Sequence, residues 1–285
     1  MHPRKLCASL VVALFLTLPL AAQQQGNPPP PPPPSSPVTQ QPPPAPQLLG
    51  PAQLDDLVKR VALYPDPLLA QVLTASTFWD QIPDADAWAN QHAYLKGDAL
   101  AQAIRDDNLQ WDPSVIALLP FPSALDMMAH DPAWTQELGQ AVLNQRGDVM
   151  DAAQRMRKRA YDYGYVRSDS YDQVVVAGGY YEILPVNPAY IYVPVYNPGI
   201  VFGPPGPGIV IGAAIGFAPA VVIGPAFAPW GWTHPYFLWG EHAIFFDNVM
   251  WGRTWTNRGY YAHPYAHPWF HRPGPRVERH VFRHR

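Results

Sequence analysis

The first stretch of the chain with a regular hydrophobic pattern runs from residue 52 to residue 164. Leu54, Leu57, Val58 and Val61 recur at positions i, i+3, i+4 and i+7, which places them on one face of a helix. Further apolar positions continue this helical period through the stretch, in sufficient number to bury one small core. We therefore expect a helical domain over residues 52–164.

The same residue pair marks three helix starts in this domain. Asp66, Asp112 and Asp131 are each followed by proline. An aspartate before a helix accepts hydrogen bonds from free N–H groups, and a proline at the first helical position removes a donor that would otherwise be unpaired. With two further start signals, these pairs divide the domain into about seven short helices. The last one is expected over residues 148–163.

The period changes to that of strands in residues 165–203. Three consecutive valines at residues 174–176, the pair Gly178 and Gly179, and an apolar run over 180–184 predict a β-hairpin with a glycine turn. Residues 190–193 predict another strand. Pro185 and Pro194 lack the N–H that a ladder needs, so they belong at strand ends or edges.

Residues 204–230 are rich in glycine and proline, and no charged residue occurs between 183 and 240. Residues 209–227 are almost wholly apolar, so insertion into a membrane is one interpretation. Pro219 and Pro225 would break the hydrogen bonds of a spanning helix. The sequence therefore favours an extended or membrane-surface segment.

The last zone, residues 231–285, combines aromatic side chains with seven arginines and seven of the ten histidines of the chain. We expect a tail of low order. His263, His267 and His271 recur every four residues and are weak candidates for a metal site. Pro264 and Pro268 prevent the regular helix that would align them. The tryptophans of the zone fit stacking on sugars, a membrane interface, or packing over the apolar segment and strands.

The N-terminus has the layout of a secretory signal peptide. Arg4 and Lys5 precede an apolar run over residues 6–18, and small residues follow at Ala21 and Ala22. We expect export after removal of residues 1–22, which also removes Cys7, the only cysteine. Residues 23–51 contain a run of seven prolines among the 37 of the chain and predict a stiff, disordered spacer.

Several strings in the helical and strand regions resemble the domain-of-unknown-function family 3300 (DUF3300), a family of exported bacterial proteins. They begin at Tyr64 (YPDPLLAQVLTAST), Lys96 (KGDALAQA), Trp111 (WDPSV), Asp148 (DVMDAAQRMR) and Pro185 (PVNPAYIYVPVYNP). The resemblance covers about residues 54–203. It implies an extracytoplasmic α+β protein, a multi-helix part followed by short strands, and it assigns no catalytic residue.

Candidate chemistry is sparse. Asp84 with Asp86, and Asp106 with Asp107, are carboxylate pairs of the kind that a hydrolase uses, but their positions near helix ends favour capping or exposure. A basic cluster, defined by Arg155, Arg157, Lys158 and Arg159, is either a patch for an anionic polymer or a set of cations that complements a helix dipole. The dipole interpretation needs no partner and is favoured.

These observations favour a non-enzymatic structural or interaction module of the periplasm or outer envelope. Its expected partner is an envelope protein or cell-wall polymer, with a membrane surface as a possible contact, and neither nucleic acid nor a cofactor is expected. The alternatives are an envelope glycan or peptidoglycan hydrolase and a membrane-associated protein that inserts residues 209–227. Because fold alone does not specify function, the choice depends on the site.

Overall fold

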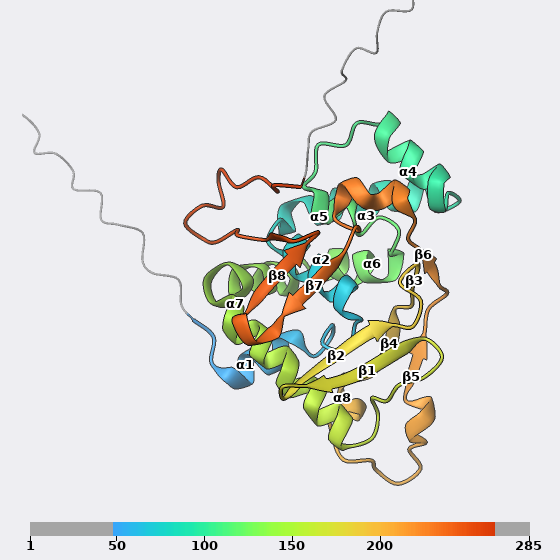
Figure 1. Ribbon diagram of the computed structural model, residues 1–285, viewed down its shortest axis with the longest axis vertical. Coiled ribbons are helices and arrows are strands. Elements are labelled where there is room, and N and C mark those ends of the chain that lie inside the picture. The colour runs from blue at the N-terminus through green and yellow to red at the C-terminus, as the bar shows by residue number, and fades with distance from the viewer. Residues whose placement is uncertain (1–47, 266–285) are drawn as a thin grey trace, which may run out of the picture. The chain divides into compact units, whose positions relative to one another are not determined.

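The computed structural model describes residues 48–265, which belong to one compact unit. The expected signal peptide, most of the proline-rich spacer, His267 and His271 lie outside the described residues. Between residues 48 and 265 the chain forms helices followed by short antiparallel strands, which confirms the α+β prediction (Figure 1).

The helical part begins with α1 (Pro51–Val58), α2 (Asp66–Ser76) and the short 3-10 helix η1 (Trp79–Gln81). It continues with α3 (Ile82–Gln91), α4 (Gly97–Asp106), α5 (Pro113–Ile116), α6 (Pro122–His130) and α7 (Pro132–Asp162). Leu54, Leu57, Val58 and Val61 are all buried, as their spacing predicts. Seven α-helices therefore occupy residues 51–162, in agreement with the sequence.

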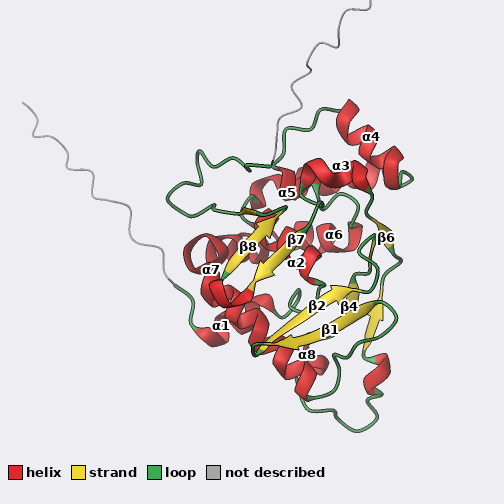
Figure 2. Ribbon diagram, viewed as in Figure 1, coloured by secondary structure: helices red, strands yellow, loops and turns green. Residues whose placement is uncertain are grey.

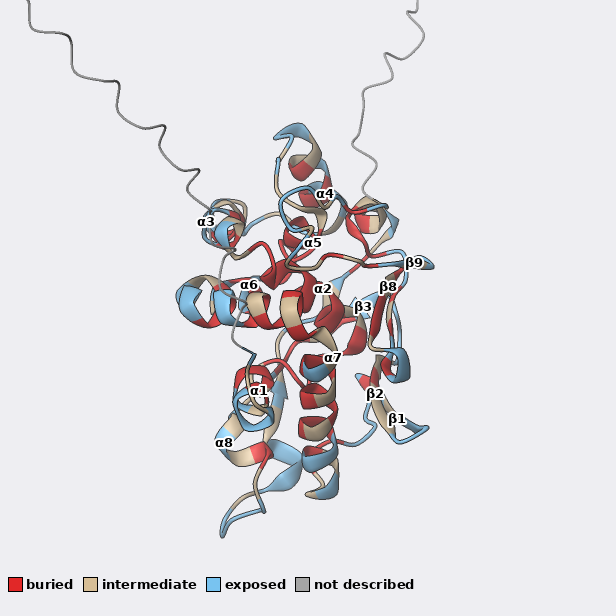
Figure 3. Ribbon diagram, turned by 90° about the vertical axis from the view of Figure 1, so that its left-hand side faces the viewer, coloured by how far each residue is buried: buried red, intermediate tan, exposed pale blue. Residues whose placement is uncertain are grey.

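Helix α2 lies at the centre of the fold. It contacts α5, α7, β2 (Tyr180–Pro185) and β7 (Pro235–Leu238). Every residue of α2 except Pro67 is buried, and Figure 3 shows this helix in the colour of buried residues inside the others. A helix that is apolar on nearly all sides is expected in such a central position.

Two details of the helical part differ from the sequence-based expectations. The helix expected over 148–163 corresponds to the part of α7 after a kink, and α7 extends back from there to Pro132 through Gln145, whose dihedral angles are non-helical (φ −146°, ψ 48°). Its side-chain amide bonds both the N–H and the carbonyl of Leu49, at 2.7 and 3.0 Å. Asp112 and Asp131 cap helices as predicted, whereas Asp66 lies inside the first turn of α2 and does not cap it.

The predicted hairpin is present as β1 (Asp172–Ala177) and β2, which pair antiparallel from Asp172↔Pro185 to Ala177↔Tyr180. Gly178 and Gly179 form its two-residue turn with φ of +59° and +88°, the conformation that glycine adopts without steric cost. Pro185 ends β2 and Pro194 begins β4 (Pro194–Tyr196), so both prolines lie at strand ends as predicted.

The apolar segment folds against these strands. After α8 (Pro198–Val201) come the 3-10 helix η2 (Ile211–Ala213), β5 (Ile215–Phe217), β6 (Val221–Val222) and the 3-10 helix η3 (Pro225–Trp230). Strand β5 pairs with β4, and β6 pairs with β3 (Tyr190–Ile191). Residues 209–227 thus form no continuous helix. Within the part of the chain that the structure describes, no helix has the length and apolar character to cross a membrane.

The expectation of a tail of low order is wrong for residues 231–265. The chain there forms β7, the 3-10 helix η4 (Trp239–Glu241), β8 (Ala243–Phe246) and β9 (Val249–Met250), a three-stranded sheet in the order β7-β8-β9. Figure 1 shows β7 and β8 crossing over α2. Trp232, Trp239 and Trp251 are buried in the same core as the helices, so packing is the correct interpretation for these three tryptophans.

Within residues 48–265 the strands form four small sheets rather than one layer, and Figure 2 shows these strands in yellow beside the helices. Helices and strands contribute to a single hydrophobic core. Between residues 48 and 265, the compositional zones of the sequence therefore share one core and do not pack as separate domains.

Candidate functional site

The candidate site is a cavity of about 550 Å³ between the end of α7, the hairpin β1–β2 and the segment that leads into β5. We call it the hairpin cavity. Its walls are mainly apolar and include Leu63, Val166, Ile183, Ile211, Ile215 and Phe217. Five side chains with polar groups also line it: Tyr165, Arg167, Asp169, Tyr171 and Asp172. An apolar hollow with a few convergent polar groups is the usual form of a small-molecule site.

The end of α7 places Tyr165 in the wall. Gly164 has φ +86°, so the chain turns sharply after the helix. Its N–H bonds the carbonyl of Tyr161 at 3.0 Å, and the N–H of Tyr165 bonds that of Ala160 at 2.9 Å. This is the Schellman arrangement of a helix C-terminus, which needs a left-handed residue at the glycine position. Tyr165 and Val166 are consequently folded back and buried.

A tight turn places Asp172 at the start of β1. One carboxylate oxygen of Asp169 accepts hydrogen bonds from the N–H groups of Tyr171 and Asp172, at 2.7 and 2.9 Å. The N–H of Asp169 in turn bonds the carbonyl of Asp172 at 2.9 Å. Aspartate favours such local turns because its short side chain reaches the backbone two or three residues further on.

The carboxyl group of Asp172 is held in an environment that disfavours its charge. Only 5% of the residue is exposed. Burial, followed by repulsion from Asp169, raises its pKa to about 7, although Arg157 acts in the opposite direction. Perturbed carboxyl groups in hollows are typical of functional sites. Asp172 cannot be recognised from the sequence, because a single aspartate before a strand carries no distinctive pattern.

A buried ion pair is hydrogen-bonded to β2, the hairpin strand that carries Ile183 of the cavity wall. Arg157 and Asp66 are 2.5 Å apart, and their side chains are 0% and 5% exposed. The guanidinium also donates to the carbonyls of Ala62, Tyr64 and Tyr181 at 2.8–2.9 Å. The guanidinium of Arg157 therefore makes its hydrogen bonds inside the fold, and its charge does not complement the dipole of α7.

Asp66 is equally well bonded. It accepts from the N–H of Ile183 at 3.2 Å and from the indole N–H of Trp239 at 3.1 Å. These bonds link α2 to β2 and to η4. The expected capping role of Asp66 is replaced by this long-range role.

The other members of the basic cluster also have acidic partners. Arg155 and Arg159 both face Asp55, at 2.7 and 3.8 Å, and Lys158 pairs with Asp162 at 2.5 Å. The dipole interpretation fits Arg159, which lies in the last turn of α7, and the ion pairs add acidic partners that the sequence did not predict. The patch for an anionic polymer stays a prediction, with two carboxylates beside these three cations.

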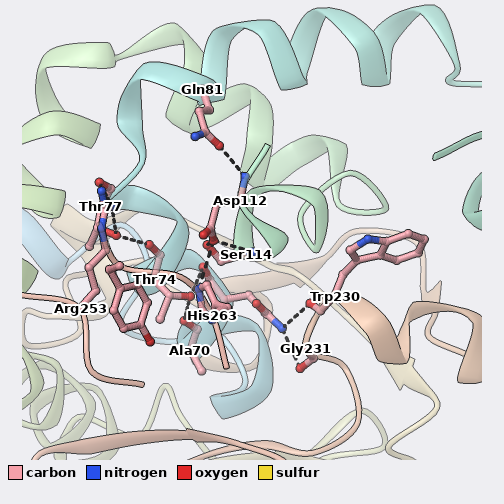
Figure 4. A network of polar contacts seen from close by, with 12 residues as sticks. Ala70, Thr74, Thr77, Gln81, Asp112, Ser114, Trp230, Gly231, Arg253 and His263 are labelled. Atoms are coloured by element: carbon pink, nitrogen blue, oxygen red, sulfur yellow. Dashed lines mark hydrogen bonds and ion pairs between the residues drawn. The ribbon is translucent and has the colours of Figure 1, made fainter. Parts of the chain in front are cut away.

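A second polar cluster surrounds Asp112 (Figure 4). Its carboxylate accepts from the N–H and the hydroxyl of Ser114, at 2.9 and 2.6 Å, and its own N–H bonds Gln81 at 2.7 Å. His263 Nε2 lies 3.1 Å from the same carboxylate oxygen. The hydroxyl of Ser114 points to the aspartate and not to the histidine, so the three residues do not have the order of a nucleophilic triad.

His263 is buried among the rings of Phe78, Phe246, Tyr261 and Tyr265. In residues 48–265, no group of three or more histidine, cysteine or acidic side chains is arranged to hold a metal ion. The weak metal candidacy of His263 with His267 and His271 stays a prediction, because the latter two lie outside the described residues.

The carboxylate pairs named in the sequence lie away from the hairpin cavity. Asp84 is exposed on α3, and Asp86 accepts from Asn90 at 3.0 Å. Asp106 accepts from Gln102 at 2.7 Å, and Asp107 accepts from the indole of Trp88 at 2.7 Å. None of the four lines the cavity.

The fold and the cavity define an α+β domain with an apolar hollow beside its hairpin β1–β2. The sequence profile described as "Protein of unknown function (DUF3300)" matches residues 50–271, which is most of the chain, and the chain belongs to this family. The match extends beyond residue 203 through the segment that lines the cavity and the sheet β7–β9. The residues that form the site are thus inside the family domain.

A relative with a curated description is the "Uncharacterized protein YacH" of Escherichia coli (strain K12). It is 35% identical over 184 residues, which cover 53% of this chain and 30% of that protein. The chain thus matches about a third of the length of this relative. No solved structure matches the chain.

Proposed function

We propose that this protein is an exported, non-enzymatic binding module of the bacterial cell envelope, and that its ligand occupies the hairpin cavity. The observation that carries the proposal is the cavity itself, about 550 Å³ and lined chiefly by aliphatic and aromatic side chains. Cavities of roughly 300–1,000 Å³ are typical of small-molecule sites. The layout of residues 1–22 as a signal peptide supports the export.

The surroundings of the cavity support binding rather than catalysis. Catalysis needs a reactive group beside a second group that moves its proton or stabilises the developing charge. The charged neighbours of Asp172 have structural tasks: Asp169 holds the turn, and the guanidinium of Arg167 donates to the carbonyls of Tyr161 and Val166 at 2.6 and 2.7 Å. Arg157 is bound to Asp66 and to three carbonyls.

The segment over the cavity gives a ligand a way in. Ile211 is 38% exposed, and its side chain lies within contact distance of the position that a Cβ at Gly164 would occupy. Residues 203–214 are mostly exposed and contain glycines at 203, 206, 208 and 212. Such a segment has few buried contacts, so its opening costs less free energy than the opening of a core element.

The test is a calorimetric titration of the processed protein, purified from the envelope fraction, with the neutral probe 2-phenylethanol. We expect saturable binding at one site. The variant Ile215→Trp fills the cavity from β5 and should abolish it. Val222→Trp is the matched control, because it places the same side chain on β6 at a position that is 50% exposed and outside the cavity.

Both variants are first checked for a native melting transition. Absence of saturable binding in the wild type, or binding that survives in a folded Ile215→Trp variant, would contradict the proposed function.

A further inference from the structure

The region between the hairpin β1–β2 and the sheet β7–β9 contains very few polar side chains. It comprises residues 186–222, with β3, β4, α8, η2, β5 and β6, and we call it the apolar lobe. No acidic, basic, histidine, glutamine, serine or threonine side chain occurs in it. Its only side chains with polar groups belong to two asparagines and three tyrosines.

Most of these few polar groups are used inside the fold. The side-chain oxygens of Asn187 and Asn197 each accept a hydrogen bond from the backbone N–H two residues further on, at 3.0 and 2.9 Å. The hydroxyl of Tyr196 donates to a backbone carbonyl at the end of α1 at 3.0 Å. The hydroxyls of Tyr190 and Tyr192 remain, so the surface of the lobe offers little to water or to a polar partner.

Large apolar side chains of the lobe are nevertheless exposed. Among the described residues, thirteen large hydrophobic residues are exposed, and six of them belong to the lobe. They are 38–70% exposed: Val186, Tyr190, Val195, Val210, Ile211 and Val222. Single exposed hydrophobic residues are normal, but a group of them with no charge between them marks an interaction surface.

The loop between α8 and η2 forms the outermost part of the lobe. Figure 1 shows this loop at the lower end of the molecule, and residues 203–214 are mostly exposed (Figure 3). Pro204, Pro205 and Pro207 lie in it. Proline has no N–H, so these residues carry no backbone donor that would lose its hydrogen bond in an apolar medium.

The edge of the lobe carries an arginine and a tyrosine. A Cβ at Gly164 would lie 3.7 Å from the guanidinium of Arg167 and 3.9 Å from Ile211, so this exposed arginine lies beside the exposed isoleucine. Tyr171 is 37% exposed and packs on Phe217 at 4.5 Å between ring centroids. Tyrosine and arginine beside an apolar surface are typical of proteins that contact a bilayer, because both side chains suit the headgroup level.

We propose that the apolar lobe docks on a phospholipid bilayer and that the loop over residues 203–214 enters the boundary between headgroups and acyl chains. This inference goes beyond the proposed function and does not require an occupied cavity. A protein partner fits the lobe less well, because protein interfaces have a polar rim and many hydrogen bonds. A bilayer accepts an apolar loop without either. The backbone carbonyls of the loop need water or headgroups as partners, so the insertion is shallow.

The test is flotation of the processed protein with vesicles of phosphatidylethanolamine and phosphatidylglycerol. We expect the protein to float with the vesicles in about 0.1 M and in about 1 M salt, because salt screens charges and does not weaken apolar burial. Failure of the wild type to float would overturn the proposal. Flotation that is lost in high salt would also overturn it, because attraction between charges would then account for the binding.

A pair of matched variants locates the contact. Val210→Asp places a charge at the most exposed apolar position of the lobe and should lower the vesicle partition coefficient by about tenfold or more. Val176→Asp makes the same change at a position of β1 that is 48% exposed and outside the lobe, and should leave partitioning unaltered. Both variants are first checked for a native melting transition. Equal partitioning of the two folded variants would contradict docking through the lobe.

A fluorescent label measures the insertion itself. Cys7 lies in the expected signal peptide, so an introduced cysteine would be the single thiol of the processed protein. An environment-sensitive dye on Val210→Cys should shift its emission to the blue when vesicles are added, whereas the same dye on Val176→Cys should not. Absence of a shift at both positions, or the same shift at both, would contradict insertion of the loop.

Sedimentation of the wild type without vesicles tests the other occupant of the lobe, a second copy of the chain. We expect a monomer. A dimer that Val210→Asp converts to a monomer would overturn the proposal. Failure of vesicle binding would leave the titration of the hairpin cavity with 2-phenylethanol unaffected, so each of the two proposals can fail without the other.

Discussion

Arg157 and Asp66 form an ion pair of 2.5 Å in the interior of the protein, between residues 91 positions apart in the chain. The pair joins α7 to α2, and its further hydrogen bonds reach β2 and η4. The face of Trp239 lies 4.9 Å from the guanidinium carbon. One polar contact thus connects the helical part to β2 and to η4, and it holds the backbone of Ile183, which lines the hairpin cavity.

We predict that Arg157→Met destabilises the protein by about 3–5 kcal/mol, because it leaves the buried carboxylate of Asp66 without its cation. Urea unfolding followed by circular dichroism measures the change. Arg155→Met is the control on the same helix, because Arg155 is 40% exposed beside Asp55 and its loss should cost about 0–1 kcal/mol. Equal destabilisation by the two variants would contradict the central role of the buried pair.

A second prediction concerns the pH dependence of stability. Burial raises the pKa of Asp172 to about 7, above its value of 3.8 in the unfolded chain. The folded protein therefore holds this proton more tightly, so the stabilisation is complete below pH 4 and is lost as the pH rises through 7. Relative to Asp172→Asn, the wild type should lose up to about 4 kcal/mol in unfolding free energy between pH 4 and pH 8. Urea midpoints of both proteins across this range measure it, and parallel profiles would refute the shifted pKa.

A third prediction tests the contact between α2 and α7. A Cβ at Gly139 would lie 2.0 Å from the backbone carbonyl oxygen of Ser76, and backbone atoms cannot move aside as a side chain can. Gly139→Ala should destabilise the protein by about 3 kcal/mol or more. At Gly147 on the same helix, the nearest atom is a side-chain carbon of His242 at 3.3 Å, so Gly147→Ala should be close to neutral. Melting temperatures of the two variants distinguish these outcomes.

The fourth prediction concerns export. If residues 1–22 act as a signal peptide, the protein recovered from the envelope fraction should begin near residue 23. Intact-mass measurement of the purified protein determines its N-terminus. Replacement of Leu10 and Leu16 by arginine would interrupt the apolar run and should leave the precursor unprocessed in the cytoplasm. Full-length protein in the cytoplasm of the unaltered strain would count against the envelope location.

Local signals in the sequence predicted local structure well. The hairpin followed from two glycines between apolar runs, and the caps at Asp112 and Asp131 followed from the proline after each aspartate. The buried face of Leu54, Leu57, Val58 and Val61 followed from its helical period. In each case the physical cause acts over a few neighbouring residues, so the pattern alone specifies it.

The site could not be predicted in this way. In sequence, Asp66 resembles the capping aspartates and Arg157 resembles its exposed neighbours. Their pairing depends on the approach of two distant helices, so the local pattern does not reveal it. The same limit applies to the aromatic zone, in which Trp232 donates to the carbonyl of Ala117 at 3.0 Å and is buried against Phe121. Asp172 and Tyr165 line the hairpin cavity only because the fold brings β1, the end of α7 and the segment before β5 together.

Methyl NMR of the isoleucine residues tests the central claim most directly, since it locates a bound ligand without a variant. Ile183, Ile211 and Ile215 line the hairpin cavity, whereas Ile82 and Ile104 are buried in the helical part. Addition of 2-phenylethanol to isoleucine-labelled protein should shift the methyl signals of the first three and leave those of the other two in place. Saturating shifts at Ile82 or Ile104 alone, or no shift at any isoleucine, would contradict a binding site beneath the hairpin.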